Sequence, residues 1–198
     1  MRRIIGLVLF VTGALLLSYV GGTYGRGYLA AERARRAWEA AEAHAAVAMA
    51  RDASNRRASP SHLAPGAPVA RLLIPSIGLD EVVVEGVEDE SLLAGPGHLP
   101  GSPFPGETGN AIISAHRDRH FHGLGALQVG DTIITDTGQR RMSWIVTSTR
   151  VVDKDARALF STREPTLTLT TCWPIRYLGA APDRLLVRAV PIKHWKQA

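Results

Sequence analysis

The stretch TLTLTTCWP, residues 166–174, decides the fold class and holds the only cysteine of the 198-residue chain. Its period of two predicts a β-strand whose leucines share one face, while Thr170 and Cys172 lie on the other. The leucine face is expected to pack into a core. Cys172 therefore lies at a strand end on the more polar face, whereas a cysteine kept for packing is expected among apolar side chains.

A single thiol limits the chemistry that the chain can perform. With no second cysteine, an internal disulfide is impossible, and a metal site built from thiolates is disfavoured. Three roles remain for Cys172: a nucleophile, a partner in an intermolecular bond, or an inert packing residue.

Six further runs of alternating or β-branched residues surround this strand in the sequence. They cover residues 69–74, 81–86, 110–116, 131–138, 142–152 and 184–190. Short strands separated by glycine-rich turns predict an all-β domain, an antiparallel barrel or sandwich. Short helical turns are expected at residues 90–95 and 155–160.

Arg184 opens the run that follows the cysteine strand after an 11-residue loop. If these two strands pair antiparallel, the last residue of one faces the first residue of the next, which makes Cys172 and Arg184 neighbours. A guanidinium in that place can donate hydrogen bonds to an oxyanion. The alternative is a surface arginine that forms an ion pair with the adjacent Asp183.

A thiol catalyst also needs a proton carrier, and the chain has seven histidines. Three of them, His44, His62 and His194, fall in the predicted stalk, linker and tail. His116 closes its run as Cys172 closes its own, which favours one shared rim. Loop candidates are His98, His120 and His122. The cluster at residues 116–122 offers three imidazoles to a metal, but no cysteine lies near it, so we predict no metal.

The segment GPGHLPGSPFPGETG, residues 95–109, has Gly or Pro at nine of its 15 positions. Prolines restrict φ and glycines permit unusual φ, so this loop is expected to have a defined shape and to wall a groove. A plain surface connection is the alternative.

The charge of the chain is concentrated outside the predicted domain. Residues 1–68 carry nine arginines and four acidic side chains, whereas residues 69–198 carry 14 basic and 14 acidic side chains. Nucleic-acid binding needs a basic face on the domain itself, so this balance disfavours a nucleic-acid partner.

The N-terminus begins with two arginines and continues with an uncharged run over residues 4–22. That length approaches the thickness of the hydrocarbon core of a bilayer, which predicts an uncleaved membrane anchor over residues 1–25. A cleavable signal peptide is the alternative, although no A-x-A site follows the run.

Residues 28–50 are rich in Ala, Glu and Arg, and their propensity predicts a helix. We assign residues 26–68 to a helical stalk and linker, and residues 69–198 to the β domain. In the stalk, Trp38 is expected to act as an anchor at the membrane interface rather than as a recognition residue.

The orientation of the anchor rests on opposing signals. Arg2 and Arg3 favour a cytoplasmic N-terminus, whereas the arginines at 26, 33, 35 and 36 pull the opposite way. We expect the domain on the extracytoplasmic side of the cell membrane, because a single short N-terminal anchor is the common arrangement for export.

Several motifs in order resemble the sortases, most closely class D sortases and the related sortases of Gram-negative bacteria. They are RLLIPSIGL, GPGHLPG, GNAIISAHRDRHF, LQVGD, TLTLTTCWP and APDRLLVRA, and together they cover essentially all of residues 70–190. Sortases are membrane-anchored cysteine transpeptidases.

This resemblance implies a closed eight-stranded β-barrel with Cys172 as nucleophile, His116 as general acid and base, and Arg184 stabilising the substrate or the oxyanion. Its substrate would be an exported protein with a C-terminal LPxTG-like signal cleaved at Thr-Gly, and the acyl group would pass to an amine of a cell-envelope precursor or a protein lysine. No cofactor is implied. Residues expected to contact the substrate are His98, Asn110, His120 and Thr171.

Two residues depart from the family pattern. Ala115 stands where many members have glycine, and Trp173 follows the thiol where class D members usually have tyrosine. Two alternatives to a transpeptidase stay open: a thiol hydrolase resolved by water, and a non-catalytic anchored barrel that binds peptides.

Overall fold

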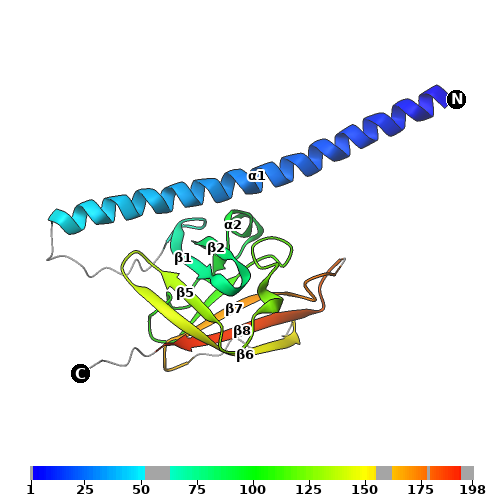
Figure 1. Cartoon of the computed structure of the whole chain (residues 1–198). Helices are drawn as coiled ribbons and strands as arrows, with labels where there is room; N and C mark the ends of the chain where they lie inside the picture. Colours follow the sequence, from blue (N-terminus) through cyan, green and yellow to red (C-terminus); the bar gives the residue numbers. More distant parts are fainter. Residues whose placement is uncertain (1, 52–62, 155–161, 178, 193–198) are drawn as a thin grey trace, which may run out of the picture.

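The computed structural model describes residues 2–51, 63–154, 162–177 and 179–192. Eight strands close into a barrel in the order β1-β2-β3-β4-β7-β8-β6-β5. Their bounds are β1 Pro68–Ile74, β2 Leu79–Glu85, β3 Gly97–His98, β4 Asn110–Ser114, β5 Thr132–Asp136, β6 Arg141–Asp153, β7 Thr166–Trp173 and β8 Asp183–Pro191. The helices are α1 Arg2–Arg51 and α2 Asp89–Ala94, and the 3-10 turns are η1 Pro75–Ile77 and η2 Leu124–Ala126 (Figure 1).

The predicted closed eight-stranded barrel is confirmed, and each of the seven runs read from the sequence overlaps one of its strands. The purely antiparallel reading is wrong, because β2 pairs with β3 and β4 pairs with β7 in parallel. The predicted helical turn at residues 90–95 corresponds to α2, whereas the one at 155–160 lies outside the described residues. The strand that the alternation did not predict, β3, has two residues and lies in the Gly- and Pro-rich segment.

The interior of the barrel is filled by the inward faces of these strands. Alternate residues of β7 and β8, among them Leu167, Leu169 and Val187, are fully buried in one cluster. Among the described residues Trp144 is the largest fully buried side chain, and its indole Nε1 donates a hydrogen bond to Thr135 Oγ1 at 2.8 Å. A buried indole N–H needs such a partner, so this bond lets a large ring fill the barrel without an unpaired donor.

The Gly- and Pro-rich segment forms a loop that close packing and hydrogen bonds hold in one position. A Cβ at Gly97 would collide with the carbonyl oxygen of Gly86, so β3 can approach β2 only with glycine there. Further along the loop, Glu107 accepts a hydrogen bond from the Phe104 amide at 2.9 Å, and Arg140 donates one to Gly106 O at 2.6 Å. These bonds tie the loop to itself and to the β5–β6 turn.

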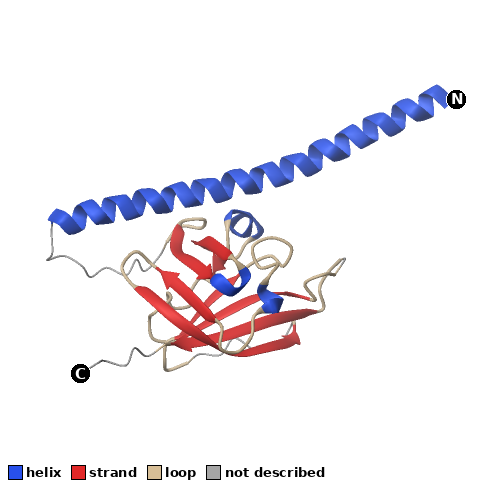
Figure 2. Cartoon of the chain, viewed as in Figure 1, coloured by secondary structure: helices blue, strands red, loops and turns tan. Residues whose placement is uncertain are grey.

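Helix α1 combines the apolar N-terminal run with the predicted stalk in one continuous element. It is long and apolar enough to cross a membrane, and none of its most apolar window is buried by the rest of the chain. Figure 1 shows α1 running over the side of the barrel that carries β1, β2 and α2, with its N-terminal part extending beyond the barrel. Figure 2, coloured by secondary structure, shows this long helix beside a domain built mostly of strands.

The expected role of Trp38 as an anchor at the membrane interface is wrong. This side chain is 5% exposed and lies in a small cluster with Ala34, Val82 and Val84. Ala34 and Trp38 are four positions apart and so lie on one face of α1, which packs on the outer face of β2. The stalk therefore lies on the barrel along this face. Among the described residues, the Trp38 indole Nε1 has no hydrogen-bond partner.

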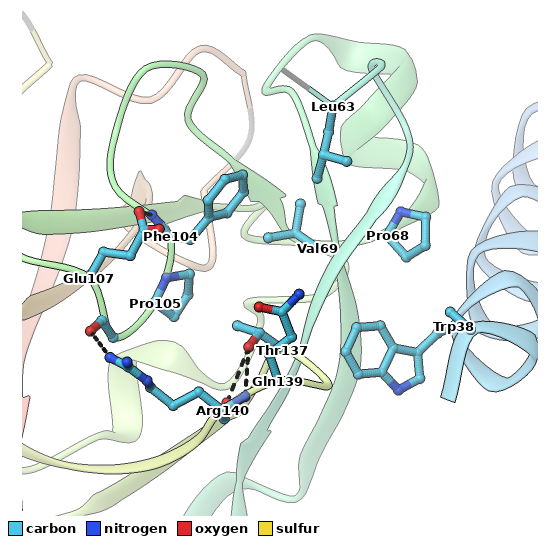
Figure 3. A pocket seen from close by; sticks show the side chains of 12 residues that line it. Trp38, Leu63, Pro68, Val69, Phe104, Pro105, Glu107, Thr137, Gln139 and Arg140 are labelled. Atoms are coloured by element: carbon cyan, nitrogen blue, oxygen red, sulfur yellow. Dashed lines mark hydrogen bonds between the residues drawn. The ribbon is translucent and has the colours of Figure 1, made fainter. Parts of the chain in front are cut away.

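A hollow of about 380 Å³ lies beside Trp38, between α1, the start of β1 and the β5–β6 turn. Figure 3 shows the indole on the α1 side of this hollow, with Phe104 and Pro105 on the other side. Phe104 and Pro105 precede β4, so they lie near the end of the barrel where β4 and β7 begin.

Replacing Trp38 with Ala is expected to release this part of α1 from the barrel, because truncating a buried Trp costs about 3–5 kcal/mol. Trypsin should then cleave faster after the exposed Arg33, Arg35 and Arg36, measured by mass spectrometry on the full chain in detergent. Tyr28→Ala is the matched control, since that aromatic ring on the same helix is 73% exposed. Equal cleavage of both variants would contradict the docking.

Candidate active site

Cys172 and Arg184 face one another across two neighbouring strands. β7 and β8 pair antiparallel, and their register places Cys172 directly opposite Arg184. Directly opposed residues of an antiparallel pair have Cβ atoms about 4.5–5.5 Å apart and lie on the same side of the sheet. The neighbour relation expected from the sequence is confirmed.

His116 reaches the same level from the other side of β7. β4 and β7 run parallel with Ser114 opposite Thr170, and His116 and Cys172 each follow two positions further along their own segment. Continued parallel pairing would bring these two residues to matching heights. The pairing continues past the end of β4, because the Ala115 amide donates a hydrogen bond to Thr170 O at 3.2 Å. β7 therefore lies between the strand ends that carry His116 and Arg184.

All three side chains belong to the outer face of the barrel. The inward residues of β7 and of the segment that continues β4, such as Leu169 and Ala115, are buried in the core cluster, and Cys172 and His116 alternate with them. On β8 the inward residue next to Arg184 is Leu185, which is 2% exposed. His116, Cys172 and Arg184 are each half-buried, which leaves them accessible to a peptide on this face.

Thr171 fixes the backbone beside two of these residues. Its side chain is 2% exposed, and its hydroxyl donates a hydrogen bond to Ala115 O at 2.7 Å. Ala115 directly precedes His116, and Thr171 directly precedes Cys172. This bond therefore ties the residue before the imidazole to the residue before the thiol. Because the Thr171 side chain points inward, it is not placed to contact a substrate on the outer face, as was predicted. It supports the backbone beside His116 and Cys172 instead.

The guanidinium of Arg184 is oriented by the backbone of the preceding residue. Nη1 donates a hydrogen bond to Asp183 O at 3.0 Å. Within the described parts of the chain, Arg184 forms no ion pair. The alternative of a surface ion pair with the Asp183 carboxylate is therefore not observed. The remaining donors of the planar guanidinium are available to an anionic group on the outer face.

His98 was expected in a loop, but it belongs to β3 and is 1% exposed. It pairs with the inward residue Ile113, whereas His116 follows on the outward face, so the two imidazoles lie on opposite sides of the sheet. Nδ1 of His98 is 2.7 Å from Glu85 Oε2, and Nε2 is 2.9 Å from Ser102 Oγ. Phe104 stacks on the ring at 4.8 Å.

This network indicates a structural role for His98, which joins β2, β3 and the Gly- and Pro-rich loop. Both ring nitrogens already have partners, and no face of the ring is open to a substrate. Sequence reasoning missed Glu85, because an acidic residue at the end of a strand has no local signal for a partner 13 positions away.

Two other predicted substrate contacts lie at different places around the barrel. Asn110 begins β4 on the same face as His116 but six residues earlier, which is roughly 20 Å along a strand. It is 5% exposed and accepts a hydrogen bond from Thr168 Oγ1 at 2.8 Å. His120 lies beyond the turn after His116, with Nδ1 3.2 Å from Glu81 Oε1.

No group of three or more His, Cys, Asp or Glu side chains suited to a metal occurs among the residues that the structure describes. In the cluster at residues 116–122, His120 faces β2, and His122 Nδ1 is 2.6 Å from Arg119 O. The three imidazoles thus have separate environments rather than a common centre.

Comparison with known proteins gives the family of the barrel that carries these three side chains. The family model of the Sortase domain matches residues 72–192. This chain belongs to the sortase family.

Sortase D of Bacillus subtilis (strain 168) is 34% identical over 118 residues, which make up 59% of this chain and 60% of that protein. This chain thus spans about 60% of the length of the curated relative that it matches.

Solved sortase structures share the fold. A Clostridium perfringens Sortase D5 transpeptidase is 24% identical with a TM-score of 0.64, covering 85% of this chain and 99% of that one. The catalytic domain of B. anthracis SrtD is 30% identical with a TM-score of 0.57, covering 70% of this chain and 97% of that one.

The tryptophan that follows the thiol has a clear packing role in this sortase. Trp173 and Ile175 pack against the core cluster, and both approach Gly125 in η2. A Cβ at Gly125 would lie 3.1 Å from Trp173 Cζ3 and 3.3 Å from Ile175 Cγ1. The larger ring is thus accommodated by a glycine on the facing turn.

His98→Ala is expected to destabilise this sortase by about 3 kcal/mol, because it leaves the buried Glu85 carboxylate without its partner. Thermal or urea unfolding of the full chain in detergent measures this loss. Activity per folded molecule should stay close to that of the wild type. A loss of activity as complete as that from His116→Ala, with stability unchanged, would contradict the structural role of His98.

Thr171→Val keeps the shape of the side chain but leaves the buried Ala115 carbonyl without its donor, which costs about 1–3 kcal/mol. We expect activity on a peptide substrate to fall about tenfold because His116 is held less firmly. Thr147→Val is the matched control, since that exposed hydroxyl donates to Arg188 O at 3.2 Å far along β6. Similar losses from both variants would argue against a positioning role for Thr171.

Proposed function

We propose that this sortase is a membrane-anchored cysteine transpeptidase that cleaves an LPxTG-like sorting signal between Thr and Gly. The observation that supports the proposal most directly is the register of β7, which has Arg184 opposite Cys172 on one side and, on the other, the end of β4 two residues before His116. Peptide exchange through a covalent intermediate requires a nucleophile, a proton carrier and an oxyanion donor within reach of one carbonyl.

Each of the three residues has a distinct role in the proposed reaction. Cys172 Sγ attacks the Thr carbonyl carbon, and the oxygen that becomes negative accepts hydrogen bonds from the Arg184 guanidinium. His116 then protonates the glycine nitrogen as the carbon–nitrogen bond breaks, which leaves a thioester on Cys172. An incoming amine attacks the thioester carbonyl carbon and gives its surplus proton to His116. The carbon–sulfur bond then breaks, the amine keeps the acyl group, and Cys172 is released as the thiolate that began the cycle.

The partners and location follow from the same proposal. Helix α1 would hold the enzyme in the cell membrane with the barrel on the extracytoplasmic side, where exported proteins with C-terminal signals are available. The acceptor would be an amine of a cell-envelope precursor or a lysine of another protein. Partial burial of the thiol on an outer barrel face suits a peptide that binds from outside.

Cys172→Ala is expected to abolish the covalent adduct that the wild-type chain forms with an LPxTG peptide, measured by intact mass spectrometry. His116→Ala should slow adduct formation about 10²- to 10⁴-fold, and Arg184→Ala about 10²- to 10³-fold. His122→Ala is the matched histidine control, because that side chain is exposed and, among the described residues, hydrogen-bonds only with the Arg119 carbonyl three positions earlier. An adduct that persists in Cys172→Ala would overturn the proposal.

Product analysis separates transfer from hydrolysis. With added triglycine, a transpeptidase should yield the ligated peptide at the expense of the free acid. A product that is always the free acid would favour the water-resolved thiol hydrolase, and the absence of any adduct in the wild type would favour a peptide-binding barrel.

A further inference from the structure

Arg117, the residue directly after His116, bonds to the connection between β7 and β8. Its Nη1 donates a hydrogen bond to Pro174 O at 3.1 Å, and Nη2 donates to Tyr177 O at 3.0 Å and to Gly179 O at 2.7 Å. The guanidinium carbon also lies 5.6 Å from the centre of the Tyr177 ring. One side chain thus serves three backbone carbonyls of a segment 57–62 positions further along the chain.

This connection has few other restraints of its own. Among its described residues, 174–177 and 179–182, the only backbone hydrogen bond outside the strand ladders is the one from Lys154 N to Pro182 O. Carbonyl oxygens accept but cannot donate, so an outside donor must hold them. Arg117 provides that donor for the half of the connection that follows Cys172.

The chemistry of arginine suits this contact and that of lysine does not. A guanidinium presents five N–H donors in a rigid planar fork, which can reach three carbonyls at fixed angles at once. The ammonium of lysine is a single flexible point that cannot span the same three acceptors. A change from Arg to Lys therefore keeps the charge and removes most of the geometry.

The opposite side of the connection is held by packing. Trp173 and Ile175 turn toward the core cluster and meet Gly125 of η2. The chain leaving Cys172 is thus held between this packing and the Arg117 hydrogen bonds. Since the same connection leads to Arg184, its position affects both the thiol and the guanidinium.

We propose that Arg117 is a positioning residue that locks the β7–β8 connection to the segment carrying His116, and so sets the spacing of His116 against Cys172 and Arg184. This inference rests on the proposed function of those three residues. A displacement of about 1 Å between reacting groups can cost about a hundredfold in rate, so loosening the connection lowers the turnover number more than it weakens peptide binding.

The kinetic test uses Arg117→Lys in the full chain in detergent, with an LPxTG peptide and triglycine. We expect kcat to fall about tenfold to a hundredfold while KM changes little. Arg176→Lys is the matched control, because that arginine is exposed in the same connection and its side chain forms no hydrogen bond or ion pair with the described residues. An unchanged kcat in Arg117→Lys, or an equal fall in Arg176→Lys, would overturn the positioning role.

A second measurement does not depend on activity. Trypsin cleavage after Arg176, followed by mass spectrometry at a temperature where both proteins stay folded, reports how firmly the connection is held. Cleavage should be several-fold faster in Arg117→Lys than in the wild type, and equal rates would refute the lock. If the wild type forms no peptide adduct but Arg117→Lys is cleaved faster, the proposed function fails while the lock itself stands. If the adduct forms and cleavage is unchanged, the lock fails alone.

Discussion

The position of β7 between a parallel neighbour and an antiparallel neighbour is the constraint on which the site depends. Parallel pairing with β4 directs the segment that leads to His116 alongside the end of β7, and antiparallel pairing with β8 brings Arg184 opposite Cys172. A slip of one residue in either ladder would turn a side chain to the other face of the sheet. The buried leucines and valines of these strands oppose such a slip, because it would expose them to water.

Polar contacts strengthen this register where the strands end. The Thr171 hydroxyl binds the carbonyl before His116, and Arg117 binds the chain that leaves Cys172. Both contacts use backbone carbonyls as acceptors, so they hold the path of the chain rather than a particular side chain. The outer face then presents the thiol, the imidazole and the guanidinium from strand ends whose backbone is held.

The buried pair of His98 with Glu85 lies away from that face. It closes the short β3 strand against β2 and attaches the loop at residues 99–109, which leads to the start of β4.

On the outside of β2, the Trp38 face of α1 covers Val82 and Val84. Where α1 passes the loop that follows His116, a Cβ at Gly27 would collide with the Arg119 guanidinium. The helix that carries the apolar N-terminal run is therefore packed against the domain, close to the segment that contains His116.

The sequence by itself determined the parts of this protein that depend on local pattern. Alternation in residues 166–172 and 184–190 predicted which faces are buried and which pair of residues meet, because the two strands are joined by one loop. The tertiary structure decided what depends on distant segments: the parallel pairing of β4 with β7, the inward burial of His98, and the packing of Trp38. It also decided the contacts of Arg117, whose acceptors are carbonyls. Every residue has a carbonyl, so no amino-acid type could reveal these partners before the chain was folded.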